Sequence, residues 1–142
     1  MTKYNSTKIK AYGRTWDSKV ELQYYEYLLK LQESGEVKSV TIQPKCELLP
    51  KFERNDVKYR AITYTPDYLV KYSDGSEVYI DVKGMGTPAS ELRRKLFAYF
   101  IGKPLQWISQ SKKYSETGWI DYDELRKIRR DNKKKKMEDA NG

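Results

Sequence analysis

Two runs of alternating side chains near the middle of the chain constrain the fold more than any other segment. Residues 61–72 and 77–83 are rich in β-branched and aromatic residues, and the Ser-Asp-Gly-Ser sequence between them is a strong hairpin signal. Successive side chains of a strand point to opposite faces, so Asp81 and Lys83 share one face while the intervening valines and isoleucine pack on the other. The sequence therefore predicts two antiparallel strands that present a carboxylate and an ammonium group together.

Asp67 lies on the first of these strands, and the length of the turn decides whether it joins the second carboxylate. A two-residue loop would place Asp67 opposite Val82, whereas a three-residue loop ending at Gly75, or one bulge, would place it opposite Asp81. Only the second register puts the two aspartates side by side on one face. A shared chemical site requires that register, so we predict an odd-length loop or a bulge. An undistorted two-residue hairpin would contradict the site.

Other patterns predict the elements upstream of the hairpin. Residues 17–34 have apolar side chains at helical spacing, with Ser18 placed to cap the start and a glycine just after the end. Short strands are expected at residues 39–43 and 46–52. The polar segment 53–59 is expected to be a loop.

A second helix is predicted after the hairpin, with Thr87 as its N-cap and Pro88 at its first position. Its expected apolar face consists of Leu92, Leu96, Tyr99 and Phe100. A short strand is predicted for residues 104–109 and a last helix for 121–130. The order of helix, three or four strands, helix and strand is typical of an α/β domain with a central mixed sheet flanked by helices.

The length of 142 residues has room for one domain with a single modest core. We expect a basic, irregular arm at 1–16, a single domain at 17–130 and a disordered basic tail at 131–142. No stretch is long and apolar enough to span a membrane, and the first residues lack the apolar run of a secretory signal. The expected location is therefore the cytoplasm.

Composition narrows the chemistry that is available. The chain has no histidine and one cysteine, Cys46, which excludes an intramolecular disulfide and a zinc site of Cys/His type. Cys46 is expected to be a small buried hydrophobe. Any catalysis must therefore use carboxylates, lysine, hydroxyl groups and bound metal.

The charge balance favours a polyanionic partner. The formal charge is +8, from 28 Lys and Arg against 20 Asp and Glu, and the 13 tyrosines suit stacking on bases. A solvated basic tail, and tyrosines that merely cap the core, would explain the same composition. Nucleic acid is the leading class of partner, and composition alone does not establish it.

The two aspartates and the lysine together suggest metal-assisted phosphodiester chemistry. Two carboxylates at neighbouring strand positions repel, and a divalent cation between them removes the repulsion. Oxygen ligands without histidine or thiolate select Mg²⁺ or Mn²⁺, which can activate water and neutralise charge on a phosphate. The structural alternative is that Asp67 is a turn residue and that Asp81 and Lys83 form an exposed ion pair, because short Asp-x-Lys strings are common.

The Pro-Asp at residues 66–67, the thirteen residues after it and the Asp-Val-Lys that follows resemble the PD-(D/E)xK, or restriction-endonuclease-like, nuclease superfamily. The resemblance covers roughly residues 17–108 and implies a core of the order α-β-β-β-α-β. The segments Asp-Val-Lys-Gly-Met-Gly-Thr-Pro and Arg-Arg-Lys-Leu-Phe are similar to a small phage-borne group. That group is regarded as akin to the phage endonucleases that resolve branched DNA.

The resemblance also implies roles for individual residues. Asp67 and Asp81 would bind the metal together with the carbonyl of Val82, and Lys83 would position the attacking water. Glu21, on the first predicted helix, would be a further ligand. A structural alternative applies to Glu21, because at the third helical position it could simply complete a capping box with Ser18.

Several basic residues are predicted contacts for nucleic acid. They are Arg14, Lys19, Arg93, Arg94, Lys95, Lys112 and Lys113. Lys95 lies between Leu92 and Tyr99 in the second predicted helix, so it is expected to face the site together with its arginine neighbours. A solvated basic face whose long side chains lie over the sheet explains the helical residues equally well.

The sequence thus predicts a Mg²⁺-dependent endodeoxyribonuclease acting on branched DNA such as Holliday junctions, in a bacterial or phage-infected cell. Symmetric cleavage of two strands needs two active sites, so a homodimer is expected. The alternatives are a restriction-type nuclease, a nuclease for single-stranded or duplex DNA, and a catalytically silent DNA-binding module. A basic α/β domain that binds RNA through its tyrosines is a further alternative.

Overall fold

The computed structural model describes residues 8–141. Its helices are α1 (Lys19–Glu33), α2 (Pro88–Phe100) and α3 (Tyr122–Asn141). Its strands, in chain order, are β1 (Ile9–Ala11), β2 (Arg14–Trp16), β3 (Val37–Ile42), β4 (Cys46–Leu49), β5 (Phe52–Arg54), β6 (Val57–Tyr59), β7 (Ile62–Tyr64), β8 (Tyr68–Tyr72), β9 (Glu77–Val82), β10 (Leu105–Gln110) and β11 (Trp119–Asp121). In this part of the chain no helix is long and apolar enough to cross a membrane.

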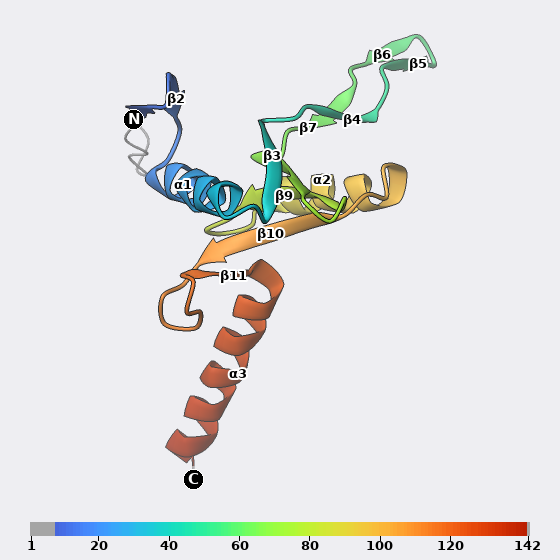
Figure 1. The fold of residues 1–142 in the computed structure, drawn as a ribbon. Coiled ribbons are helices and arrows are strands. Elements are labelled where there is room, and N and C mark those ends of the chain that lie inside the picture. Colours follow the sequence, from blue (N-terminus) through green and yellow to red (C-terminus); the bar gives the residue numbers. More distant parts are fainter. Residues whose placement is uncertain (1–7, 142) are drawn as a thin grey trace.

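A five-stranded mixed sheet forms the centre of the molecule (Figure 1). Its strand order is β11-β10-β9-β8-β3, in which β9 and β10 run parallel and every other neighbouring pair is antiparallel. Helix α1 packs against β3 and β9, whereas α3 packs against β10 and β11. The predicted fold class, an α/β domain with a central mixed sheet flanked by helices, is confirmed.

The β8–β9 hairpin has the odd-length loop that the site requires. Tyr72 donates its N–H to the carbonyl of Ser76 over 2.8 Å, and Gly75 closes the loop with φ +94°, a conformation that suits glycine. Further along the hairpin Tyr68 pairs with Ile80. The next position in this register places Asp67 opposite Asp81, as predicted.

Helix α1 forms where the sequence predicts it, two residues shorter at the start and one at the end. Ser18 caps it by accepting the N–H of Glu21 over 3.1 Å. Tyr24 and Leu28 are buried on its inner face. They pack against apolar side chains of the sheet, which include Tyr68, Val70 and Ile80.

Helix α2 begins at the predicted cap, but of its predicted apolar face only Leu96 packs against the core. Thr87 and Ser90 form a reciprocal capping box, with Pro88 in the first turn. Leu92, Tyr99 and Phe100 are 54%, 82% and 53% exposed. Periodicity identifies a helix but not which of two adjacent apolar stripes is buried.

The stripe of α2 that is buried contains Phe97. Its ring packs edge-on against Tyr64 and Tyr79, beside Cys46 and Leu48 of the strand β4. Cys46 is buried, as expected. A second, smaller core therefore forms on the α2 side of the sheet.

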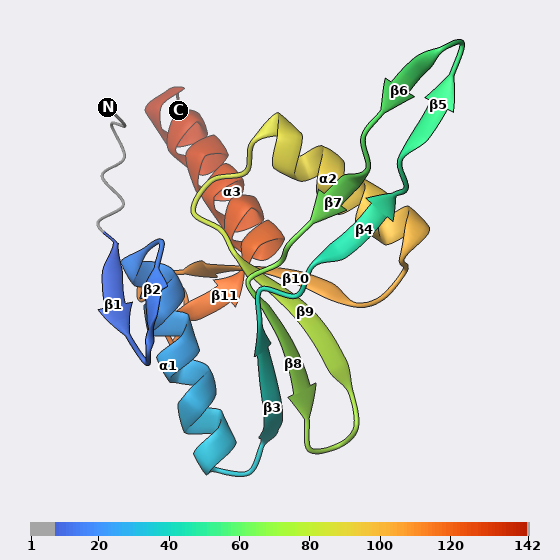
Figure 2. The same ribbon diagram turned by 90° about the horizontal axis from the view of Figure 1, so that it is seen from above.

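The segment expected to be a loop at 53–59 is instead a β-hairpin, and this prediction was wrong. Strands β5 and β6 pair across Asn55 and Asp56, which both have positive φ, as the turn of a two-residue hairpin requires. With β4 and β7 they form a ribbon that projects away from the sheet (Figure 2). The predicted strand 61–72 is broken at residues 65–67, because β7 belongs to this ribbon and β8 to the central sheet.

Both predicted flexible ends also need correction within the described residues. Residues 1–7 of the predicted basic arm lie outside them, but β1 and β2 form a hairpin where an irregular chain was expected. Helix α3 continues to Asn141 through most of the tail that was predicted to be disordered. That stretch contains no glycine or proline before residue 142, and lysine, arginine and glutamate are good helix formers.

Candidate active site

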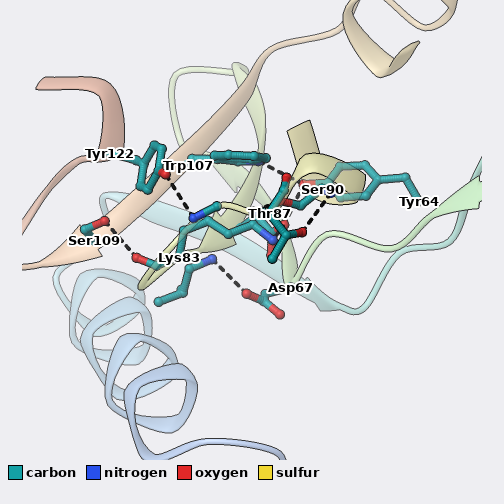
Figure 3. A network of polar contacts seen from close by, with 11 residues as sticks. Tyr64, Asp67, Lys83, Thr87, Ser90, Trp107, Ser109 and Tyr122 are labelled. Atoms are coloured by element: carbon teal, nitrogen blue, oxygen red, sulfur yellow. Dashed lines mark hydrogen bonds and ion pairs between the residues drawn. The ribbon is translucent and has the colours of Figure 1, made fainter. Parts of the chain in front are cut away.

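Asp67, Asp81 and Lys83 meet at the end of the β8–β9 hairpin. Figure 3 shows Asp67 and Lys83 within the surrounding network of polar contacts. Asp81 is only 5% exposed, and the Nζ of Lys83 lies 3.2 Å from its Oδ2 atom. Asp67 accepts the backbone N–H of Val82 at its own Oδ2 over 2.7 Å. The three predicted residues are therefore brought together by strand register and alternation.

Val82 shows why Asp67 can enter the sheet edge at this point. The pairing of β8 with β9 ends at Tyr68 and Ile80, so the N–H of Val82 extends past the last strand partner on that side. The Asp67 carboxylate accepts this N–H in place of a strand carbonyl. Because the N–H of Lys83 points the other way, to Ile108 on β10, the carbonyl of Val82 lies on the Asp67 side.

Two aromatic residues hold the Asp81 carboxylate, and sequence reasoning missed both. Tyr64 donates its hydroxyl to Asp81 Oδ2 over 2.6 Å, and the indole N–H of Trp107 donates to that hydroxyl over 3.1 Å. Trp107 is the neighbour of Asp81 in the parallel β9–β10 register. Only the strand order could have revealed Trp107. Tyr64 is the last residue of β7, just before the interruption between β7 and β8, which the sequence did not reveal.

The backbone that carries Lys83 is fixed on its other side. Its N–H donates to the carbonyl of Ile108 and its carbonyl accepts the hydroxyl of Ser109, both over 2.7 Å. Further along, Gly86 donates its N–H to the hydroxyl of Tyr122 over 2.9 Å. A Cβ at Gly86 would lie 2.7 Å from that hydroxyl oxygen, so the close approach requires glycine.

The pKa values of Asp67 and Glu21 are raised, because both carboxyl groups are partly removed from water and lie close to other carboxylates. Burial raises the pKa of Asp67 to about 9, and the charge of Asp81 and a hydrogen bond to it act in the same direction. Burial also raises the pKa of Glu21, with contributions from the charges of Asp17 and Asp81. Without a cation, the structure therefore favours a proton on Asp67 at neutral pH.

Glu21 adjoins Asp67 rather than completing a capping box. Its backbone N–H donates to Ser18, but the described residues show no return bond from its carboxylate to the Ser18 backbone. Instead Glu21 and Asp67 line one small cavity together with Arg14. The structural alternative, a purely capping role, loses its main support.

Arg14 comes from the β1–β2 hairpin and reaches the same cavity. Its guanidinium lies 5.0 Å from the centre of the Trp16 ring, and its Nε is buried without a hydrogen-bond partner. An unpaired buried donor is costly, and an acceptor such as a phosphate oxygen would satisfy it. The structure thus brings one predicted nucleic-acid contact next to the carboxylates.

The other predicted contacts divide into two groups. Arg94 lies near the site, with its guanidinium 4.5 Å from the centre of the Trp107 ring and bonded to Asp123. The rest are exposed: Lys19 at the start of α1, Arg93 and Lys95 on α2, and Lys112 and Lys113 after β10. Lys95 lines a cleft on α2 together with Arg94, while Phe97 is the buried residue of this helix, so the expectation that Lys95 faces the site stays a prediction.

The donor set fits a hard divalent cation through its aspartates. In the part of the chain that the structure describes, no three carboxylate, thiolate or imidazole side chains form a ready-made metal cluster. Asp67 and Asp81 nevertheless lie opposite each other on the hairpin, and each uses one oxygen in the hydrogen bonds above. Two acidic oxygens and the carbonyl of Val82 are the kind of ligands that Mg²⁺ and Mn²⁺ prefer.

Fold and site together define an α/β domain in which a buried Asp81, a half-buried Asp67 and Lys83 lie at the end of the central β8–β9 hairpin. The chain belongs to the family described as a protein of unknown function, DUF1064, which matches residues 1–116. All four predicted site residues lie within that match, whereas α3 lies beyond it. Comparison with curated proteins and with solved structures finds no match.

Proposed function

We propose that the protein is a metal-dependent endonuclease that hydrolyses phosphodiester bonds in branched DNA. The observation that carries this proposal is the hairpin register, which sets Asp67 opposite Asp81 with Lys83 Nζ 3.2 Å from the second carboxylate. The order of elements from α1 through β8, β9, α2 and β10 agrees with the PD-(D/E)xK nuclease superfamily that the sequence resembles. The charge of +8 supports a nucleic-acid substrate.

The proposed ligands of Mg²⁺ or Mn²⁺ are Asp67, Asp81 and the Val82 carbonyl, with Glu21 as a further carboxylate. A divalent cation bound there would supply charge neutralisation at the scissile phosphate and a more acidic water. Tyr64 keeps one Asp81 oxygen in a fixed orientation by donating its hydroxyl. Outer hydrogen bonds of this kind set the geometry of carboxylate ligands.

Lys83 is placed to act on the phosphate or on the attacking water. Its ammonium group lies 5.0 Å from the centre of the Trp107 ring and its side chain is 20% exposed. One side of the group is thus held by the indole and Asp81, while the rest stays accessible to a substrate. An ammonium in this position donates hydrogen bonds to the water or to a phosphate oxygen and offsets negative charge in the transition state.

A dimeric state follows from the proposed activity on branched DNA. Cutting two strands of a junction symmetrically needs two centres, so we propose a homodimer acting in the cytoplasm of a bacterial or phage-infected cell. The described residues form one central sheet with its flanking helices and one projecting ribbon. This arrangement favours recognition of DNA shape over a long base sequence.

A catalytically silent DNA-binding module is the second candidate. One observation favours it: the described carboxylates do not converge into a preformed cluster of three metal ligands. In that case Asp67 would keep its proton, and its hydrogen bond to Asp81 would have only a structural role. The experiment below separates the two candidates directly.

The test is cleavage of a labelled four-way junction and a matched linear duplex in Mg²⁺, with EDTA as the metal-free control. We expect the wild-type protein to cut the junction in preference to the duplex, and Asp81→Asn to bind the junction without cutting it. Lys71→Gln is the matched control, because Lys71 lies on the same hairpin in an exposed ion pair. If the wild-type protein binds the junction but cleaves it no faster than Asp81→Asn does, the nuclease proposal is rejected in favour of a catalytically silent DNA-binding module.

A further inference from the structure

A groove between α3 and the loop after β10 gathers basic side chains outside the site described above. It has a volume of about 500 Å³, and five of its lining residues are basic. They are Lys113, Arg129, Lys133, Lys135 and Lys136. A hydrogen bond of 2.9 Å from Asn132 to the hydroxyl of Tyr114 ties the loop to the helix across this groove.

The groove adjoins a cleft that is lined by Lys83 of the candidate active site. This second cleft, of about 420 Å³, is lined by Lys83, Gly84 and Ser109, and Arg129 lines both clefts. Helix α3 is itself joined to the loop after β9 through the bond between Gly86 and Tyr122. A chain-like ligand could therefore run from Lys83 past Arg129 and along the helix.

The fold does not need the distal part of α3. Only Tyr122 and Leu125 of this helix are buried, and every residue from Arg129 to Asn141 is exposed. Figure 1 shows the helix extending away from the sheet. Between residues 126 and 136 it carries eight basic side chains against one acidic one, and like charges on adjacent turns destabilise a helix. A bound polyanion would remove that repulsion.

We infer that this groove binds the phosphate backbone of a DNA strand that leads into the active site. The inference rests on the proposed nuclease function, since it supplies the path along which the substrate reaches Asp81 and Lys83. None of the groove's lysines forms an ion pair with another described residue, so their charges are free for phosphates. An anionic membrane fits poorly, because beyond Ile128 the helix has no apolar face to insert.

The helix offers a matched pair of triple variants for the test. Arg129→Gln, Lys133→Gln and Lys136→Gln remove three charges from the groove. Lys127→Gln, Arg130→Gln and Lys134→Gln remove three charges of the same residue types from outside it. Glutamine keeps helix propensity close to that of lysine and arginine, so both variants should fold, which circular dichroism checks.

Binding to a four-way junction is measured in EDTA by fluorescence anisotropy over a range of salt concentrations. The groove variant should lower the slope of log affinity against log salt by about 3, and weaken binding at least about tenfold at low salt. The control variant should change the slope by less than about 1. Equal losses in both variants, or no loss in the groove variant, would overturn the inference.

The proposed function can fail separately. These binding measurements contain no metal and involve no cleavage, so they do not depend on whether the junction is cut. If the groove variant alone loses DNA binding but the wild-type protein never cleaves DNA in Mg²⁺, the groove remains a DNA site and only the nuclease function is rejected. Binding of the groove face to anionic phosphatidylserine vesicles with no effect on DNA would instead reject the groove inference.

Discussion

The two ends of the β8–β9 hairpin carry chemically similar ion pairs in different surroundings. Lys71 and Glu77 lie 3.6 Å apart near the turn, with side chains 51% and 46% exposed. At the other end Lys83 and Asp81 lie 3.2 Å apart, with side chains 20% and 8% exposed. Sequence alone presents both as lysines beside carboxylates on neighbouring strand positions.

The difference lies in what surrounds each carboxylate. Glu77 faces water, where an ion pair adds little free energy and neither partner is held in one geometry. Asp81 is held by Tyr64 and Lys83, and Asp67 lies opposite it on the hairpin. Burial and fixed partners, and not the residue types, therefore distinguish a candidate active site from a surface ion pair.

The largest difference between the two ends is expected in catalysis. Asp81→Asn should lower the rate of junction cleavage by about 10³-fold, because it removes a charge where the transition state is stabilised. Glu77→Gln, the matching change at the turn, should leave the rate within about twofold. Single-turnover cleavage in Mg²⁺ measures both, and similar losses in the two variants would break the comparison.

A second difference is expected in the pH dependence of stability without metal. The pKa of Asp67 is about 9 in the folded protein, above its ordinary value of 3.8, so the folded state binds this proton more tightly than the unfolded state. The stability that this group contributes is complete below about pH 4 and is lost as the pH rises towards 9.

Asp67→Asn should therefore flatten this dependence and make the metal-free protein more stable at neutral pH. Urea denaturation in EDTA across the pH range tests this expectation. Glu77→Gln, at the exposed end, should follow the wild-type profile. Parallel profiles for wild type and Asp67→Asn would show that Asp67 is not the buried acid described here.

Tyr64→Phe tests whether the hydrogen bond to Asp81 matters for function. Loss of an outer partner of a metal-binding carboxylate typically costs about 10- to 100-fold in metal affinity or activity. The lost hydrogen bond should lower the free energy of unfolding by about 1 kcal/mol. Titration of Mg²⁺ against cleavage rate measures the first effect and chemical denaturation the second. An unchanged Mg²⁺ dependence would make Tyr64 a purely structural residue.

The smallest effect is expected for the exposed ion pair itself. A double-mutant cycle of Lys71→Ala and Glu77→Ala should give a coupling free energy of about 0.2–0.5 kcal/mol. High salt should reduce this value further, because solvent-exposed charges are screened. A coupling above about 1 kcal/mol would show that the two ends differ less than their exposure suggests.

The sequence predicted the site because its signal is local. Strand alternation fixes Asp81 and Lys83 on one face, and the loop ending at Gly75 determines the position of Asp67. The residues around them required tertiary information. Trp107 lies next to Asp81 because β9 and β10 pair in parallel. Tyr64 reaches Asp81 because the extended segment is interrupted between β7 and β8. Neither feature has a clear sequence pattern.

The errors in the fold have similar causes. Most of the apolar stripe expected on α2 is exposed, because the position of Phe97 between Tyr64 and Tyr79 decides which side of the helix faces inward. The hairpin at Asn55 and Asp56 was missed because each of its strands is only three residues long and fully exposed, which is too short for alternation to mark a strand. Local propensity could not supply either result.

The ribbon formed by β4 to β7 also has a consequence for how sequences of this kind can diverge. Residues 50–60 are all exposed, so their length and side chains can change without disturbing the packed parts of the molecule. The ribbon nevertheless ends at Tyr64, which bonds directly to Asp81. Insertions and replacements are therefore tolerated at the tip and excluded at the base, which makes the tip a natural place to graft a new recognition segment within reach of an unchanged centre.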